Sequence, residues 1–215
     1  MSVKYITGLV WAGCHTLGLL TLADKPRIEE ASRPRGKARM DEEREEKRKD
    51  YIDWETYFMA MALVCAKRSK DPKTQVGACI VNKKKRIVGT GYNGMPDRCS
   101  DDKLPWGKGE GLEWNKHLYV CHAEMNAILN RFSADLKNCK IYVTLFPCNH
   151  CTQMIIQSGI REVVFLSDEK KDKEEVKASK KLLDMADVHY RSYDGSRNII
   201  KIEFPQDPVV GQSSR

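Results

Sequence analysis

The sequence predicts an α/β protein in which helices are layered against a partly parallel sheet. Three observations predict it. Short apolar runs rich in β-branched residues alternate with helical-period segments from about residue 50 onward. Two of these runs flank a short lysine-rich turn and predict a hairpin, while helices separate the later ones, as parallel strands require. With 215 residues, 41% apolar and 31% charged, the chain can form one soluble domain of ordinary size plus extensions.

Apolar residues at helical spacing predict the first element, an amphipathic helix over 54–69 that the Asp71-Pro72 dipeptide ends. The spaced residues are Trp54, Phe58, Met61 and Cys65. Strands over 75–82 and 86–93 form the hairpin, and an irregular insertion over 94–120 follows. A loop of that length inside a compact domain is usually functional or disordered.

The remaining elements alternate regularly. Helices are expected over 122–131, 148–158 and 173–186, and strands over 140–146, 162–167 and 188–193. A last apolar run, "NIIKIEF" over 198–204, either extends the sheet or covers it. We therefore expect a domain over 51–204 and a flexible tail over 205–215.

Residues 1–50 are expected to be an N-terminal extension and charged linker outside this fold. The apolar stretch 5–23 is short for a membrane span and is interrupted by glycines and a histidine. A targeting segment and a dispensable leader are the two interpretations, and Met40 would serve as an alternative start.

Charge and cysteine content narrow the function classes. The net charge of +7 is spread along the chain, which suits anionic small molecules such as nucleotides and argues against a clustered nucleic-acid groove. The eight cysteines include several in apolar periodic segments, so a reduced intracellular chain with one metal site explains them better than disulfides.

Two predicted strand-to-helix junctions carry the parts of a catalytic zinc site. His122 and Glu124 open one helix, and Cys148 and Cys151 open another, behind Pro147 at its expected first helical position. A helix N-terminus favours thiolates, which bind metal. Three protein ligands leave the fourth tetrahedral position for a water whose pKa zinc lowers to roughly 7. Glu124 is then free to move protons.

Each half of this pattern has a simpler interpretation. A single CxxC pair is often redox-active or structural, and a single histidine is often a satisfied core residue. Together, at two such junctions, they favour zinc, and the spacing H-x-E…P-C-x-x-C is the signature of zinc deaminases.

Four segments resemble the eukaryotic deoxycytidylate (dCMP) deaminases, over roughly 51–204. They are "RSKDPKTQVGACIVN", "GYNGMPDRCSDDKLPW", "CHAEMNAI" and "LFPCNHC". The resemblance implies a three-layer α-β-α cytidine-deaminase-like fold with a central mixed sheet of about five strands. It also implies a cytoplasmic enzyme with one Zn²⁺ per subunit that hydrolyses dCMP to dUMP and ammonia, supplying dUMP for thymidylate synthesis.

The resemblance also assigns residue roles. Glu124 would transfer protons, the backbone around Ala123 would contact the pyrimidine O2, and Asn93 would contact the sugar unless it is a plain Asn-Gly turn. Relatives are homohexamers that dCTP activates and dTTP inhibits. The corresponding regulatory region here comprises Arg68, Lys70, Lys73, Tyr92 and Gly94, with a solvated basic loop as the alternative.

Some family features stay open. A second zinc would need Cys99, His117 and Cys121, which lack a CxxC-like pairing, and Lys170 or Lys171 either meets a phosphate or belongs to a solvated charge run. We expect no nucleic-acid partner, and no membrane contact by the core domain. The alternatives are a polynucleotide (RNA or DNA) cytidine or adenosine deaminase with the same zinc chemistry, and a zinc-stabilised scaffold, against which Glu124 argues.

Overall fold

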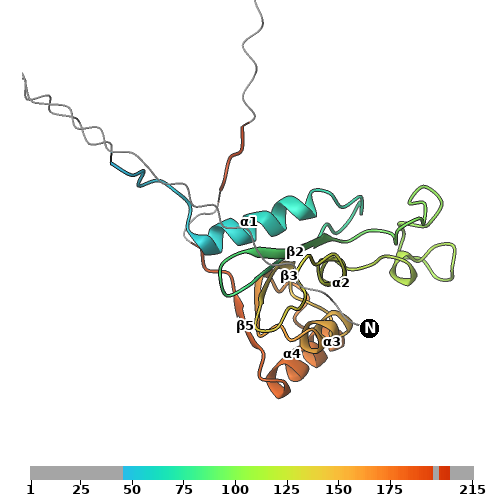
Figure 1. Cartoon of the computed structure of the whole chain (residues 1–215). Coiled ribbons are helices and arrows are strands. Elements are labelled where there is room, and N and C mark those ends of the chain that lie inside the picture. The colour runs from blue at the N-terminus through green and yellow to red at the C-terminus, as the bar shows by residue number, and fades with distance from the viewer. Residues whose placement is uncertain (1–45, 196–198, 204–215) are drawn as a thin grey trace, which may run out of the picture. The chain divides into compact units, whose positions relative to one another are not determined.

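This computed structural model describes residues 46–195 and 199–203. The helices are α1 (Trp54–Ala66), α2 (Ala123–Leu129), α3 (Asn149–Gln157) and α4 (Glu174–Met185), with a short 3-10 helix η1 (Lys116–Leu118) (Figure 1). The strands are β1 (Gly77–Val81), β2 (Ile87–Tyr92), β3 (Lys140–Leu145), β4 (Glu162–Ser167) and β5 (His189–Ser192). Each helix and strand expected over 54–193 is present, with its ends shifted by at most a few residues.

The five strands form one mixed sheet in the order β2-β1-β3-β4-β5. Strand β1 is antiparallel to both β2 and β3, whereas β3, β4 and β5 run parallel. Helices α3 and α4 supply the crossovers that the parallel strands need. The carboxyl end of β3 therefore opens onto the same edge of the sheet as the amino end of α3, which is where ligands bind in such folds.

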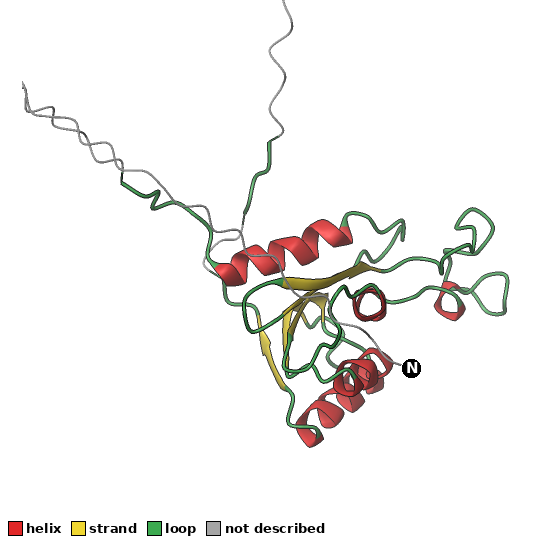
Figure 2. Ribbon diagram, viewed as in Figure 1, coloured by secondary structure: helices red, strands yellow, loops and turns green. Residues whose placement is uncertain are grey.

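Residues that alternate along the strands face two separate cores. Cys79, Tyr142 and Val164 pack against α1 on one face. The neighbouring Ala78, Ile80, Ile141, Val143 and Val163 pack against α2, α3 and α4 on the other. Figure 2 shows α1 on one side of the sheet and the other three helices on the opposite side. The predicted three-layer α-β-α arrangement is confirmed.

The buried face of α1 differs from the predicted one. Its buried residues are Thr56, Phe58, Met59, Ala62 and Ala66, whereas Trp54 is 51% exposed. Apolar residues surround most of this helix, so their spacing alone does not identify the stripe that meets the sheet. Asp53 is the N-cap of α1, and its Oδ1 accepts a hydrogen bond from the Thr56 backbone N–H at 2.9 Å.

Glycines in β1 and β2 allow helices to lie close to the sheet. A Cβ at Gly91 would lie 2.3 Å from both the carbonyl oxygen of Ala123 and the backbone nitrogen of Ala127. A Cβ at Gly77 would lie 1.9 Å from the carbonyl oxygen of Ala62. The space beside Gly91 is therefore taken by α2, whose N-cap is His122 and whose first turn contains Glu124.

Outside these elements, η1 is the helical turn within the insertion that the sequence predicted to be irregular. Residues 199–203 belong to no strand. The targeting segment, the start at Met40 and the flexible tail lie outside the described residues, so these and the domain boundaries stay predictions. Among the described residues, none of the helices is both long and apolar enough to cross a membrane.

Candidate metal and catalytic site

Two of the candidate metal ligands lie immediately before helices. His122 is the N-cap of α2 and Cys148 the N-cap of α3, and neither side chain caps its own helix. Both residues have extended backbones, with ψ of 158° and 170°. Because Cys148 is extended, helical geometry begins only at Asn149, and Pro147 lies one residue before the cap. The expectation that Pro147 occupies the first helical position was wrong, although the proline still directs the chain into the helix.

Cys151 completes a compact cluster one turn into α3. The Nδ1 atom of His122 lies 3.4 Å from the Sγ atoms of both Cys148 and Cys151. The three ligand atoms all lie within 4.8 Å of one another. A tetrahedral zinc ion with ordinary Zn–S and Zn–N bonds would hold sulfur and nitrogen about 3.6 Å apart. The geometry and the donor types therefore fit zinc.

The two thiols differ in acidity. Hydrogen bonds from Cys151 and His122 lower the pKa of the Cys148 thiol to about 3, despite its burial. Donation to Cys148, together with burial, raises the pKa of Cys151. Cys148 is therefore the more acidic of the two thiols, and a proton on Cys151 must be released when a divalent cation binds both sulfurs.

Glu124 lies in the first turn of α2 and is 4% exposed. Burial raises the pKa of its carboxyl group, and the charge of His122 opposes this only in part. It is not one of the three clustered ligands. A buried carboxyl whose pKa is raised can both accept and donate a proton, as general acid–base catalysis requires.

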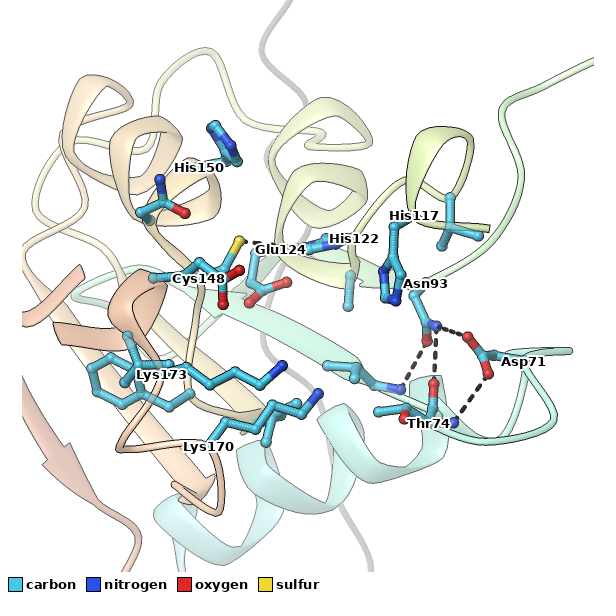
Figure 3. A pocket seen from close by; sticks show the side chains of 18 of the residues that line it. Asp71, Thr74, Asn93, His117, His122, Glu124, Cys148, His150, Lys170 and Lys173 are labelled. Atoms are coloured by element: carbon cyan, nitrogen blue, oxygen red, sulfur yellow. Dashed lines mark hydrogen bonds between the residues drawn. The ribbon is translucent and has the colours of Figure 1, made fainter. Parts of the chain in front are cut away.

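Glu124 lines a cavity of about 540 Å³ together with His122 and Cys148 of the cluster. Figure 3 shows Glu124 beside Cys148, with His122, the residue before α2, next to them. Ala123 also lines the cavity, at the N-terminus of α2. The volume of the cavity lies within the ~300–1,000 Å³ that small-molecule sites usually occupy.

The structure brings Asn93 to the same cavity, but with its amide already engaged. Its Oδ1 accepts a hydrogen bond from the Val76 N–H at 2.8 Å, and its Nδ2 donates to the Thr74 carbonyl at 3.0 Å. The side chain is 6% exposed (Figure 3). Asn93 therefore joins the loop before β1 to the end of β2, and any sugar contact would use its remaining hydrogen-bonding capacity.

The predicted regulatory residues lie around this loop. The guanidinium of Arg68 stacks on the ring of Tyr92 at 5.8 Å from its centroid. Lys70 pairs with Asp101 of the insertion, Lys73 is exposed, and Gly94 exchanges backbone hydrogen bonds with Cys121. Arg68 and Tyr92 are thus in contact, while Lys70 is engaged elsewhere.

Within the described residues, three ligand atoms cluster only at His122, Cys148 and Cys151, so Cys99, His117 and Cys121 form no second metal site there. Sequence reasoning missed a buried ion pair between Asp71 and Lys116, which also lines the cavity. The sequence did indicate a local role for Asp71, because an aspartate before a proline can accept hydrogen bonds from the backbone that follows, but we interpreted it only as the end of a helix. Nothing in the sequence around Lys116 indicated that it is buried.

A three-layer α-β-α fold with a His/Cys/Cys cluster beside a buried glutamate is the arrangement of the zinc-dependent nucleobase deaminases. Residues 52–167 match the family described as the cytidine and deoxycytidylate deaminase zinc-binding region. The chain belongs to the cytidine and deoxycytidylate deaminase family, and zinc is the cofactor of this domain.

Known relatives are similar over most of the chain. The human deoxycytidylate deaminase is 54% identical over 159 residues, which cover 74% of this chain and 89% of that protein. A probable deoxycytidylate deaminase of Drosophila melanogaster is 50% identical over 169 residues, covering 75% and 83%. The dCMP deaminase of cyanophage S-TIM5, solved in complex with dCMP and dUMP, has the same fold, with a TM-score of 0.51 at 21% identity, covering 64% of this chain and 94% of that one.

Proposed function

We propose that this chain catalyses the hydrolytic deamination of dCMP to dUMP and ammonia, and so supplies dUMP for thymidylate synthesis. The observation that carries the proposal is the buried Glu124, which shares one cavity with His122 and Cys148 of the three-ligand cluster. Similarity to deoxycytidylate deaminases over most of the chain supports this substrate.

His122, Cys148 and Cys151 would hold the zinc ion. Bound zinc supplies Lewis-acid activation of a water molecule for attack on C4 of cytosine. Glu124 accepts one proton of this water and donates it to ring N3, then takes the proton left on the oxygen added at C4 and delivers it to the departing amino group. The balance is one water consumed and one ammonia released for each dCMP converted.

The N-terminus of α2 orients the ring. The first N–H groups of a helix have no partner within it, so the backbone at Ala123 can donate to the pyrimidine O2. Asn93 lines the cavity just after β2 and can contact the sugar while keeping its bonds to Val76 and Thr74. Phe146 also lines the cavity and adds an apolar surface to it.

Ammonia release tests the proposal. Purified enzyme is incubated with dCMP, cytidine, dCTP and a single-stranded oligonucleotide in parallel, with and without dCTP as effector. We expect turnover of dCMP, and loss of that turnover after chelation with recovery when zinc is restored. Turnover of cytidine or of the oligonucleotide, but not of dCMP, would overturn the substrate assignment.

Glu124→Gln tests the proton-transfer role. The variant is expected to retain stoichiometric zinc but to lose at least about a hundredfold in kcat, because general acid–base groups contribute ~10²–10⁴-fold. Glu175→Gln is the matched control, since Glu175 lines the same cavity but is exposed. Full activity in Glu124→Gln would remove Glu124 from the mechanism.

Regulation, assembly and compartment follow the family pattern in our proposal: a cytoplasmic homohexamer, activated by dCTP and inhibited by dTTP. The contact between Arg68 and Tyr92, both exposed beside the loop that holds Asn93, supports an effector site there that includes Lys70, Lys73 and Gly94. Arg68→Ala should weaken dCTP activation without changing zinc content, and light scattering of the purified chain gives the subunit number.

A further inference from the structure

Three lysines from two distant segments line the cavity that holds Glu124. Lys108 belongs to the insertion, and Lys170 and Lys173 lie between β4 and α4. Figure 3 shows the side chains of Lys170 and Lys173 extending into the cavity, with their ammonium ends below Glu124 in this view. The zinc cluster therefore shares its cavity with lysines supplied by both segments.

The ammonium groups are close enough to act on one another. Burial, and then the charges of Lys116, Lys170, Lys73 and Lys173, lower the pKa of Lys108. Like charges repel when they converge, so this cluster must be held together by the fold or by an anion.

Little negative charge offsets these lysines. Lys116 also lines the cavity, but Asp71 neutralises it. Over residues 46–195 and 199–203, no ion pair engages Lys108, Lys170 or Lys173, although Lys177 and Lys180 of α4 pair with Glu174 and Asp168. Glu175 is the one exposed carboxylate among the described residues that line the cavity. The cavity wall therefore carries an excess of positive charge.

We propose that Lys108, Lys170 and Lys173 bind the 5′-phosphate monoester of the substrate and select a nucleoside monophosphate over the free nucleoside. The inference rests on the proposed function and adds to it the residues that recognise the phosphate. A phosphate monoester carries about −1.5 to −2 charges near pH 7, which several ammonium groups can share. An internal phosphodiester carries only one charge, so it matches this cluster of three ammonium groups less well.

The test compares two substrates in four variants: Lys108→Met, Lys170→Met, Lys173→Met and the triple variant. Methionine keeps much of the side-chain length and removes the charge. Each single variant should lose about tenfold or more in kcat/KM for dCMP, because charge-assisted hydrogen bonds to phosphate are strong. The preference for dCMP over deoxycytidine should fall by the same factor, and the triple variant should lose nearly all of it.

Lys171→Met is the matched control. Lys171 lies in the same charge run and is exposed, but it is not among the residues that line the cavity. It should leave the substrate preference unchanged. The inference is overturned if the three lysine variants retain the preference for dCMP, or if they lose activity equally on both substrates.

Two further arms separate this inference from the proposed function. If the wild-type enzyme releases no ammonia from dCMP, the proposed function fails, and calorimetric binding of dUMP against deoxyuridine still measures the phosphate contribution in each variant. If a single-stranded oligonucleotide is the better substrate and depends on the same lysines, they follow a phosphodiester backbone and the monoester assignment is wrong.

Discussion

The ammonium of Lys116 donates to the carboxylate of Asp71 although the two side chains are only 3% and 2% exposed. Asp71 also accepts hydrogen bonds from the backbone N–H groups of Lys73 and Thr74, at 2.9 and 3.0 Å. Asp71 lies in the loop between α1 and β1, and Lys116 begins η1 in the insertion. The pair therefore fixes the insertion against the loop that binds Asn93, beside the candidate catalytic cavity.

Lys116→Met should destabilise the fold strongly. The substitution leaves the Asp71 charge buried without its cation, which costs about 3–5 kcal/mol in comparable sites. Urea unfolding measures the free energy, and the double variant Asp71→Asn/Lys116→Met should lose less than the sum of the single losses. Lys70→Met is the control, because the Lys70 side chain in its pair with Asp101 is 62% exposed and its loss should change the unfolding midpoint little. Equal effects of the two lysine substitutions would contradict this account.

Asp71 also makes the free energy of unfolding depend on pH in the acidic range. Burial alone would raise its pKa, but Lys116 and the N–H groups of Lys73 and Thr74 prevail and hold the pKa below its usual value. The unfolded chain then binds the proton first, at its ordinary pKa of about 3.9. The stabilisation is complete above that pH and disappears as pH falls through the lower folded-state pKa. Unfolding free energies between about pH 6 and 3 should fall less steeply in Asp71→Asn than in the wild type.

Gly91→Ala should displace α2 from the sheet. The added methyl would lie 2.3 Å from the backbone of Ala123 and Ala127, so the helix that carries His122 must shift. We expect a loss of about 2 kcal/mol or more, together with reduced zinc content and activity. In Gly94→Ala the new methyl would meet only the Tyr92 ring, at 3.7 Å. That variant should retain zinc and stability, and a Gly91→Ala enzyme with full zinc content would disprove the packing argument.

Tyr142→Phe tests a polar connection on the α1 face of the sheet. The Tyr142 hydroxyl donates to Glu55 at 2.8 Å, and Arg191 donates to the same carboxylate at 2.7 Å. Loss of the hydroxyl should lower the free energy of unfolding by about 1 kcal/mol. Tyr57→Phe is the control, because the Tyr57 hydroxyl has no hydrogen bond within the described part of the chain. If both variants unfold at the same urea concentration as the wild type, this hydrogen bond has no net effect on stability.

The local sequence pattern was sufficient to predict the helices, the strands and the candidate metal ligands. The hairpin, the alternation of strands and helices, and the pairing of His122 and Glu124 with Cys148 and Cys151 depend on spacing within short segments. The buried stripe of α1 was not predictable in this way, because apolar residues lie on several of its sides. The extended conformation of Cys148 was also not predicted, because a proline can occupy either the first helical position or the residue before the N-cap.

The sequence by itself determined the order of the elements, the types of the metal ligands and the family. These follow from local periodicity and from short motifs whose members lie within a few residues of one another. Only the tertiary structure decided that Lys116 is buried against Asp71, that α2 lies against Gly91, and that Lys108 meets Lys170 and Lys173 around one cavity. Each of these depends on segments far apart in the chain, whose contacts arise only when the sheet and its helices pack together.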